Sequence, residues 1–448
     1  MSFKRILIAN RGEIAVRIIR ASRSLGIQSI VAHSTADSMA DFVQLADDAV
    51  CIGPAPASRS YLNIPALLFA AECSKADAIH PGYGFLSESA TFARCAEEAG
   101  FVFIGPSPSA IEIMGDKIMA KQTMLKAGVP CIPGSEGRLP DDPDAIATIA
   151  ESIGYPVMIK AVSGGGGRGM RVVTEPENLA SAITLTSEEA RNAFGDPALY
   201  LERYLQKPRH VEIQVLCDNH GNAFWVGDRD CSLQRRNQKV MEESPAVAID
   251  RSQIAEIGNL CVAACQRIGY RGVGTFEFLY EDAEFFFVEM NTRLQVEHPV
   301  TELTSGLDLV QAQILVAQGE TLKLRQQQDP VSGHAIECRL NAEDSETFVP
   351  SPGTISNWQI PEYDWLRIDT HISAGQKVPP YYDSLIAKII THASDRDQAL
   401  ARMDKALSEI IVEGVRTNLP LLRDLVRDPD VQRGAVDIHF IQNRSIET

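Results

Sequence analysis

Two glutamates in the segment GTFEFLYEDAEFFFVEMN are the residues whose type and spacing point most directly to chemistry. The pattern predicts two strands, 275–280 and 285–291, joined by a short turn. A hairpin centred on residue 283 places Glu277 directly opposite Glu289. Like charges that face each other across a sheet repel, and their apolar neighbours add a burial cost. The pair therefore needs a cation between the two carboxylates or a proton on one of them.

A third polar residue belongs to the same predicted face. Asn291 follows Glu289 by two residues, so strand alternation places both on one side. Two carboxylates and an amide oxygen are hard ligands that suit magnesium bound together with substrate phosphates. Two such ions could clamp a transferring phosphoryl group. The alternative is that one glutamate points to solvent from an edge strand.

The residues after this hairpin predict an anion pocket. Arg293, Gln295 and Glu297 alternate, so an extended chain would project all three from one side. Arginine can hold a small carboxylate-like anion through two hydrogen bonds. A glutamate beside that anion could act as a general base. The alternative is a solvated charged face.

A glycine-rich segment predicts a phosphate-covering loop. The strand pattern at 155–161 contains Lys160 and is followed by SGGGGRG at 163–169. A dinucleotide fingerprint would need a helix next, whereas 170–173 resembles a strand. We therefore expect a hairpin whose loop acts as a lid over ATP, because glycine lets backbone N–H groups approach phosphate oxygens. A plain surface hairpin is the alternative.

Two further segments carry polar side chains in a strand-like pattern. KPRHVEIQVLCD predicts a half-buried strand with His210 on its polar face, and a lone histidine there is more often structural than functional. RDCSLQRRNQK gathers Arg235, Arg236 and Lys239 in an acidic chain. These cations need anionic partners, which neighbouring acids could supply.

The elements that must position these residues fall into three predicted parts. Residues 1–115 alternate strand and helix patterns, which predicts a parallel sheet with helices on both faces. Residues 116–335 contain a smaller glycine-loop part at about 131–203, followed by antiparallel strand patterns. Residues 336–448 mix strands and helices.

Three helices are expected at defined positions in these parts. One spans 87–99 and is predicted to be capped by Ser87. The other two lie near 396–409 and 416–426.

Composition excludes several classes of protein. The 448 residues carry a net charge of −17, which argues against nucleic-acid binding but allows a small anionic substrate. The nine cysteines show no paired spacing, so reduced thiols in the cytoplasm are expected rather than disulfides or structural zinc. Apolar runs are too short for a signal peptide or a membrane span.

Many segments together resemble the biotin carboxylase family, within the larger ATP-grasp group. The resemblance covers essentially the whole chain. The matching segments include KRILIANRGEIA, DAIHPGYGFLSE, YPVMIKA, GGGGRGM, RHVEIQV, DRDCSLQRRNQK, EMNTRLQVEHPVTE, AIECRLNAED and PPYYDSLIAKI. It implies an ATP-grasp fold of mixed α/β and α+β class, with an N-terminal parallel α/β domain, a lid subdomain and a C-terminal mixed domain.

The resemblance also implies roles for individual residues. ATP contacts are expected from Lys117, Lys160, Gly166, Gly167, Glu202, Arg203, Tyr204, Leu205, His210, Gln234, Asn237, Glu277 and Glu289. Magnesium or manganese is expected on Glu277, Glu289 and Asn291, and bicarbonate on Lys239, Arg293, Gln295 and the backbone of Val296. Glu297 would deprotonate bicarbonate to give carboxyphosphate, Arg339 would stabilise charge on biotin, and Tyr83 would line the biotin site.

Two positions depart from the commonest family pattern. Asn237 stands where many members have histidine, and Arg203 where many have lysine. Both departures affect nucleotide contacts rather than the reaction.

The resemblance implies partners that this sequence does not itself contain. The sequence has no Met-Lys-Met biotin-attachment motif, so a separate biotin carboxyl carrier protein and carboxyltransferase subunits are expected. Such members usually feed acetyl-CoA carboxylase and form homodimers in the cytoplasm. The alternatives are a subunit of another acyl-CoA or 2-oxo acid carboxylase, a different ATP-grasp ligase, and a catalytically inactive nucleotide-binding scaffold.

Overall fold

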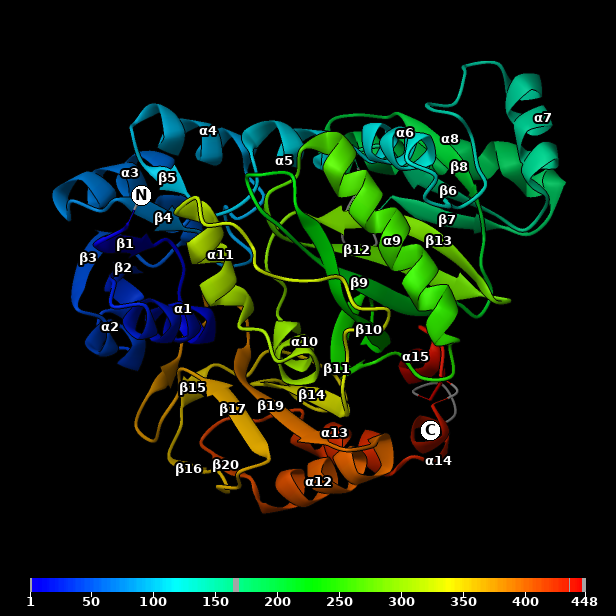
Figure 1. Cartoon of the computed structure of the whole chain (residues 1–448). Coiled ribbons are helices and arrows are strands. Elements are labelled where there is room, and N and C mark those ends of the chain that lie inside the picture. Colours follow the sequence, from blue (N-terminus) through cyan, green and yellow to red (C-terminus); the bar gives the residue numbers. More distant parts are fainter. Residues whose placement is uncertain (1, 164–168, 435, 445–448) are drawn as a thin grey trace.

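A computed structural model describes residues 2–163, 169–434 and 436–444 (Figure 1). Its N-terminal part is a five-stranded parallel sheet with helices on both faces, as the sequence pattern predicts. The strands in spatial order are β3 (Asp48–Gly53), β2 (Gln28–Ser34), β1 (Arg5–Ile8), β4 (Ala78–His80) and β5 (Val102–Phe103). The covering helices are α1 (Gly12–Ser24), α3 (Ile64–Cys73) and α4 (Ala90–Glu98). Ile6 and Ile8 pack with residues of α1, whereas Leu7 packs on the opposite face with residues of α3 and α4.

The N-terminal cap of α4 differs from the prediction. The helix begins at Ala90, and Ser89 caps it by accepting a hydrogen bond from the backbone N–H of Phe92 at 3.2 Å. Ser87 instead belongs to the preceding turn, where its backbone N–H donates to Gly84. Both serines suit a cap by type, and the turn geometry selects the later one.

A small three-stranded sheet forms the predicted glycine-loop part. Its strands in spatial order are β7 (Met170–Val173), β6 (Val157–Ala161) and β8 (Leu199–Arg203), covered by α7 (Pro143–Ile153) and α8 (Leu179–Phe194). β6 and β7 pair in antiparallel fashion, with Val157 opposite Val173. The predicted strand–loop–strand hairpin is therefore confirmed. The loop's central glycines, including Gly166 and Gly167, lie outside the described residues.

An eight-stranded antiparallel sheet forms the centre of the molecule (Figure 1). Its strands in spatial order are β13 (Glu284–Asn291), β12 (Gly272–Glu281), β9 (Arg209–Cys217), β10 (Ala223–Arg235), β11 (Gln238–Ser244), β14 (His334–Asn341), β19 (Leu385–Ala393) and β17 (Leu366–Thr370). The predicted boundary between residues 335 and 336 falls inside β14, which pairs with β11. Strands from both sides of that boundary therefore share one sheet.

Helices complete the packing of this sheet. α9 (Arg251–Ile268) packs on β9 and β10, and α10 (His298–Ser305) packs on β10 and β14. α12 (Arg396–Glu409) lies where it was expected. α13 spans Leu419–Arg427 and so begins three residues later than predicted, because its first turn starts at the Leu419-Pro420 pair, where proline is favoured.

None of the helices in residues 2–163, 169–434 and 436–444 combines the length and apolar character that crossing a bilayer requires.

Candidate active site

A cavity of about 990 Å³ collects the predicted site residues. Its wall includes residues from the N-terminal part, from β6 and from the eight-stranded sheet. The predicted residues in the wall are Tyr83, Lys117, Lys160, Arg203, Tyr204, Leu205, His210, Gln234, Asn237, Lys239, Glu277, Glu289, Asn291, Arg293, Gln295, Val296, Glu297 and Arg339. Glu202 lies behind this wall, against Lys160.

The predicted pairing of the two glutamates is confirmed, but the hairpin achieves it differently. Asp282 (φ 53°) and Ala283 (φ 62°) form the turn, so its centre lies between them rather than on residue 283. That turn alone would align Glu277 with Val288. A bulge at Val288 shifts the ladder by one residue, so Glu277 faces Glu289.

The glutamate pair is part of a row of charged side chains across four strands. On β9, Glu212 lies opposite Glu277, and on β10, Arg229 lies opposite Glu212. The Nε of Arg229 donates to Glu212 at 2.8 Å, and both side chains are fully buried. Three carboxylates on adjacent strands therefore meet one arginine at the end of the row.

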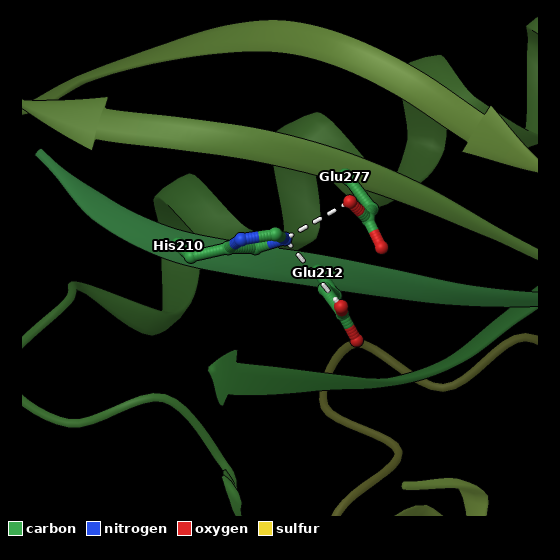
Figure 2. A group of neighbouring side chains, drawn as sticks. All are labelled: His210, Glu212 and Glu277. Carbon is green, nitrogen blue, oxygen red and sulfur yellow. Dashed lines mark ion pairs between the residues drawn. The ribbon is translucent and has the colours of Figure 1, made fainter. Parts of the chain in front are cut away.

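Two further cations face these acids from the cavity side. The Nζ of Lys239 contacts Glu212 and donates to Glu277 at 2.9 Å. The Nε2 of His210 lies 3.2 Å from Glu277 and 3.5 Å from Glu212 (Figure 2). Figure 2 shows the imidazole pointing toward both carboxylates. His210 therefore binds the acid row instead of filling a structural role alone.

These contacts set the protonation states at the centre of the site. Burial raises the pKa of Glu277, but Lys239 and His210 outweigh burial and hold that pKa well below its ordinary value. Burial lowers the pKa of Lys239, yet the surrounding carboxylates raise it well above normal. Burial also opposes the charged form of His210, and Glu277 more than compensates, so its pKa rises. The centre of the site is thus an ionised cluster.

Glu289 differs from its partner across the hairpin. Burial and repulsion from Glu277 raise the pKa of Glu289, and Lys117 offsets them only in part. Glu289 is half-buried in the cavity wall, so its negative charge is left incompletely balanced at a place that a ligand can reach. The side chains of Glu277, Glu289 and Asn291 therefore fit a divalent cation. In this structure the amide nitrogen of Asn291 donates to Glu277 at 2.7 Å, and its oxygen accepts from Arg293.

The run from Arg293 to Glu297 does not continue the strand, contrary to the prediction. β13 ends at Asn291, and the chain then bends and turns before α10 begins. The turn still brings Arg293, Gln295 and Glu297 to the cavity wall. Arg293 donates to Glu88 at 2.8 Å, which anchors the bend to the N-terminal part.

Glu297 joins the acid row to a second arginine. It accepts from Lys239 at 2.7 Å through one oxygen and from Arg339 on β14 at 2.9 Å through the other. Burial raises the pKa of Glu297, but Lys239, Arg339 and Arg229 together lower it. Glu297 is therefore ionised, and it links Lys239 in the acid row to Arg339 on β14.

The far end of the cavity carries the residues expected to contact nucleotide. Lys160 on β6 donates to Glu202 at 2.7 Å, and Lys121 donates to the other oxygen at 3.1 Å. Burial raises the pKa of Glu202, yet these two lysines lower it overall. The guanidinium of Arg203 lies 4.8 Å from the ring centroid of Phe286, next to the apolar wall.

The cationic segment on the β10–β11 hairpin has mixed partners. Lys239 binds the acids described above, whereas Arg235 stacks on Phe348 at 3.6 Å from the ring centroid. Arg236 and Asn237 form the exposed turn, with φ values of 49° and 64°. Among the described residues, Lys239 is the one of the three predicted cations that forms ion pairs with acids.

Several residues of the site were not singled out from the sequence. Glu212 and Arg229 lie on the adjacent strands β9 and β10, and the cross-strand register brings them together. Lys388 on β19 is fully buried, donates to the carbonyl of Val296 at 2.9 Å and lies 3.1 Å from Glu13. The hydroxyl of Tyr83 donates to Glu13, so this predicted biotin-site residue is held from the same network.

Comparison with known proteins places this site in a family. Models described as "Biotin carboxylase, N-terminal domain", "Carbamoyl-phosphate synthase L chain, ATP binding domain" and "Biotin carboxylase C-terminal domain" match residues 2–111, 116–325 and 337–443. The chain is 55% identical to biotin carboxylase of Pseudomonas aeruginosa over 441 residues, covering 98% of each chain. The chain belongs to the biotin carboxylase family. The predicted ATP-grasp fold class and the predicted class of ATP-dependent ligase are therefore confirmed.

Solved structures of biotin carboxylases share the whole fold. A complex of the Campylobacter jejuni enzyme with a β,γ-ATP compound is 46% identical and superposes with a TM-score of 0.94, covering 99% of each chain. The biotin carboxylase domain dimer of Hydrogenobacter thermophilus 2-oxoglutarate carboxylase, solved with magnesium ADP and bicarbonate, is 44% identical with a TM-score of 0.93. That match covers 99% of this chain and 98% of the other.

Proposed function

We propose that this biotin carboxylase carboxylates biotin on a carrier protein through carboxyphosphate, using ATP, bicarbonate and Mg²⁺ or Mn²⁺. The observation that carries the proposal is Glu297, which bridges Lys239 and Arg339 at the meeting point of the two halves of the cavity. One half holds the phosphate-binding lysines and the acid row, and the other holds Arg339. The complexes of the two solved relatives support this choice of substrates.

The bicarbonate step would use groups that line the same cavity. Lys239, Arg293, Gln295 and the backbone of Val296 hold the anion, and Glu297 removes its proton so that an oxygen can attack the γ-phosphate. Glu297 carries a depressed pKa while both cations touch it. Bicarbonate that draws Lys239 or Arg339 toward itself would restore basicity to Glu297 at the moment it is needed.

The phosphoryl transfer relies on charge balance at the hairpin. Glu277, Glu289 and a rotated Asn291 would hold divalent cations, which neutralise charge on the phosphates and on the transferring group. Lys117, Lys160 and His210 would contact the phosphates or sugar, with Gly166 and Gly167 from the glycine loop. Glu202, Arg203, Tyr204, Leu205, Gln234 and Asn237 would position the rest of the nucleotide.

The final step uses the other half of the cavity. Carboxyphosphate breaks down to carbon dioxide and phosphate, and phosphate takes the proton from the biotin ureido nitrogen. Arg339 stabilises the resulting negative charge on the ureido oxygen, and Tyr83 lines the biotin site. The deprotonated nitrogen then attacks carbon dioxide to form carboxybiotin. Hydrogen-bond donors fixed at such a charge are usually the largest catalytic contribution.

One assay tests this proposal against the alternatives. ATP cleavage by the purified chain should depend on bicarbonate, on Mg²⁺ and on free biotin. Cleavage without biotin dependence would favour another ATP-grasp ligase, and absence of turnover would favour an inactive nucleotide-binding scaffold.

The wider setting is also part of the proposal. We place the chain in acetyl-CoA carboxylase, as a cytoplasmic homodimer that works with a carrier protein and carboxyltransferase subunits. The dimeric relative supports the homodimer, and its 2-oxoglutarate substrate keeps other acceptors as the alternative. All nine cysteines are free, as expected for a reducing compartment. Coupled assays that offer acetyl-CoA, propionyl-CoA, pyruvate and 2-oxoglutarate with partner subunits would identify the acceptor.

We also propose the division into an N-terminal domain (1–115), an ATP-grasp domain (116–335) with its lid subdomain at about 131–203, and a C-terminal domain (336–448). The separate parallel sheet and the separate three-stranded sheet support the first two units. Limited proteolysis should cut near residues 115 and 131 before it cuts within the eight-stranded sheet.

A further inference from the structure

A second pair of opposed glutamates lies behind Arg339. Glu242 on β11 faces Glu337 on β14 directly, and both side chains are fully buried. Residues directly opposed on antiparallel strands have Cβ atoms about 4.5–5.5 Å apart. Two buried carboxylates at this spacing repel each other unless a cation or a proton intervenes.

The two faces of β14 differ: one is apolar and the other carries charged side chains. Ile336, Cys338 and Leu340 belong to the apolar core that includes residues of α12. Strand alternation places Glu337 and Arg339 on the other face, toward α10 and the cavity. The second glutamate pair therefore lies on the same face as the arginine that the proposed function assigns to biotin, one alternation away along the strand.

The elements packed around Glu337 bring a small set of titratable groups. They are Glu242 on β11, Arg339 on β14, Lys388 on β19, and Glu297 and His298 at the start of α10. Burial lowers the pKa of His298 well below its ordinary value, so this imidazole is neutral. The two cations of the set must balance all of its carboxylates.

Both of these cations are engaged by other acceptors. The Nε of Arg339 donates to Oε1 of Glu242 at 2.5 Å, and its Nη2 donates to Glu297. Lys388 lies 3.1 Å from Glu13 and donates to the backbone carbonyl of Val296. No contact from either cation to Glu337 is present among the described residues.

Three buried oxygens of the pair are left without donors. Both carboxylate oxygens of Glu337 and Oε2 of Glu242 have no hydrogen-bond partner within the part of the chain that the structure describes. Buried polar atoms are rarely left in this state, because each unsatisfied group costs about 1–3 kcal/mol. A proton on Glu337 converts one of these oxygens into a donor, and the facing oxygen of Glu242 is the nearest acceptor by register.

We propose that Glu337 is a positioning residue that carries a proton at neutral pH and shares it with Glu242, so that Arg339 keeps its guanidinium directed at the cavity. An ionised Glu337 would add a third carboxylate near Arg339 and draw the guanidinium toward the sheet. Burial raises the pKa of Glu337 well above its ordinary value, and Glu242 adds to that increase against the opposing effect of Lys388. Burial also raises the pKa of Glu242, to about 7.

Infrared difference spectroscopy on the full chain tests the proton directly. The wild type minus Glu337→Gln spectrum, taken at neutral pH without substrates, should contain the carbonyl band of a protonated carboxylic acid. Glu243→Gln, on the neighbouring strand β11, is the matched control, because His334 and Arg396 outweigh burial and lower the pKa of Glu243 to about 2. That control should lose carboxylate bands instead. Loss of carboxylate bands from Glu337→Gln would overturn the proposal.

Kinetics test the positioning role, and this part rests on the proposed function. Glu337→Gln keeps a neutral donor and should retain kcat for biotin carboxylation within about twofold. Glu337→Met is neutral, similar in size and cannot donate, so kcat should fall about tenfold while the KM for ATP stays unchanged. Equal kcat values for Glu337→Met and Glu337→Gln would overturn the proposal that Glu337 positions Arg339. If even the wild type fails to carboxylate biotin, the proposed function fails, while the infrared result still decides where the proton lies.

Discussion

Two of the directly opposed glutamate pairs in the central sheet, Glu277 with Glu289 and Glu242 with Glu337, differ in what surrounds them. Glu277 and Glu289 face each other at one edge, open to the cavity and close to Lys239, His210 and Lys117. Glu242 and Glu337 face each other in the interior, where Arg339 alone forms an ion pair with the pair among the described residues. Both pairs are directly opposed on antiparallel strands, yet Lys239 and His210 outweigh burial and hold the pKa of Glu277 well below its ordinary value, whereas burial holds the pKa of Glu337 well above it. The supply of counter-charge, more than burial, sets the state of each pair.

Removing the shared cation of the first pair should have the largest effect. Lys239→Met leaves Glu212, Glu277 and Glu297 without their common donor. Breaking a buried ion pair from one side costs about 3–5 kcal/mol, so the free energy of unfolding should fall by that amount. Bicarbonate-dependent ATP cleavage should be lost as well. Denaturant titration measures the stability, and an unchanged midpoint would mean that the acids do not depend on this lysine.

Removing Arg339, the cation that pairs with Glu242, should affect the biotin step. Arg339→Ala should lower biotin-dependent turnover about 10²–10³-fold, because the donor at the developing charge is gone. ATP binding, measured by calorimetry, should remain as in the wild type. A parallel loss of ATP affinity would contradict the assignment of Arg339 to the biotin half of the cavity.

Altering the outer member of the first pair should change metal dependence. Glu289→Gln keeps the shape but removes a charged ligand, so the Mg²⁺ concentration for half-maximal activity should rise at least about tenfold. Glu284→Gln, on the same strand but exposed, is the control and should leave that concentration unchanged. Equal curves for the two variants would reject Glu289 as a metal ligand.

Replacing Glu337 should change how the stability of the protein depends on pH. A carboxyl whose folded pKa is raised binds its proton in the native state but not in the unfolded state above pH about 4.3. The free energy of unfolding of the wild type should then decrease with rising pH, by up to about 1.4 kcal/mol per unit for one proton. Glu337→Gln lacks this loss, so its stability relative to wild type should improve from pH 5 to pH 9. A constant difference would show that Glu337 is already ionised.

Local patterns predicted those parts of the site that lie close together in the sequence. Glu277 and Glu289 belong to one hairpin, so alternation and a short turn were enough to pair them. The bulge at Val288 could not be foreseen, because it compensates for a turn centre that differs from the predicted one. The bend at Arg293 was also missed, since alternation of polar residues suits a strand and an irregular loop equally.

Contacts between distant strands were beyond sequence reasoning. Arg229 meets Glu212 only through the β9–β10 register, and Glu337 meets Glu242 across 95 positions of chain. The family resemblance supplied further wall residues instead, because its motifs mark single positions without giving their partners. It gave no role to Glu337, although AIECRLNAED contains it.

The continuity of the eight-stranded sheet has a mechanical consequence. Backbone pairing links each strand to its neighbour from the hairpin that carries Glu277 to the strand that carries Arg339. Bending the sheet between these two sites would break backbone hydrogen bonds, so we expect the distance between the sites to stay constant. The three-stranded sheet around β6 is separate from the eight-stranded sheet, so we expect the movement that admits and releases nucleotide to come from it.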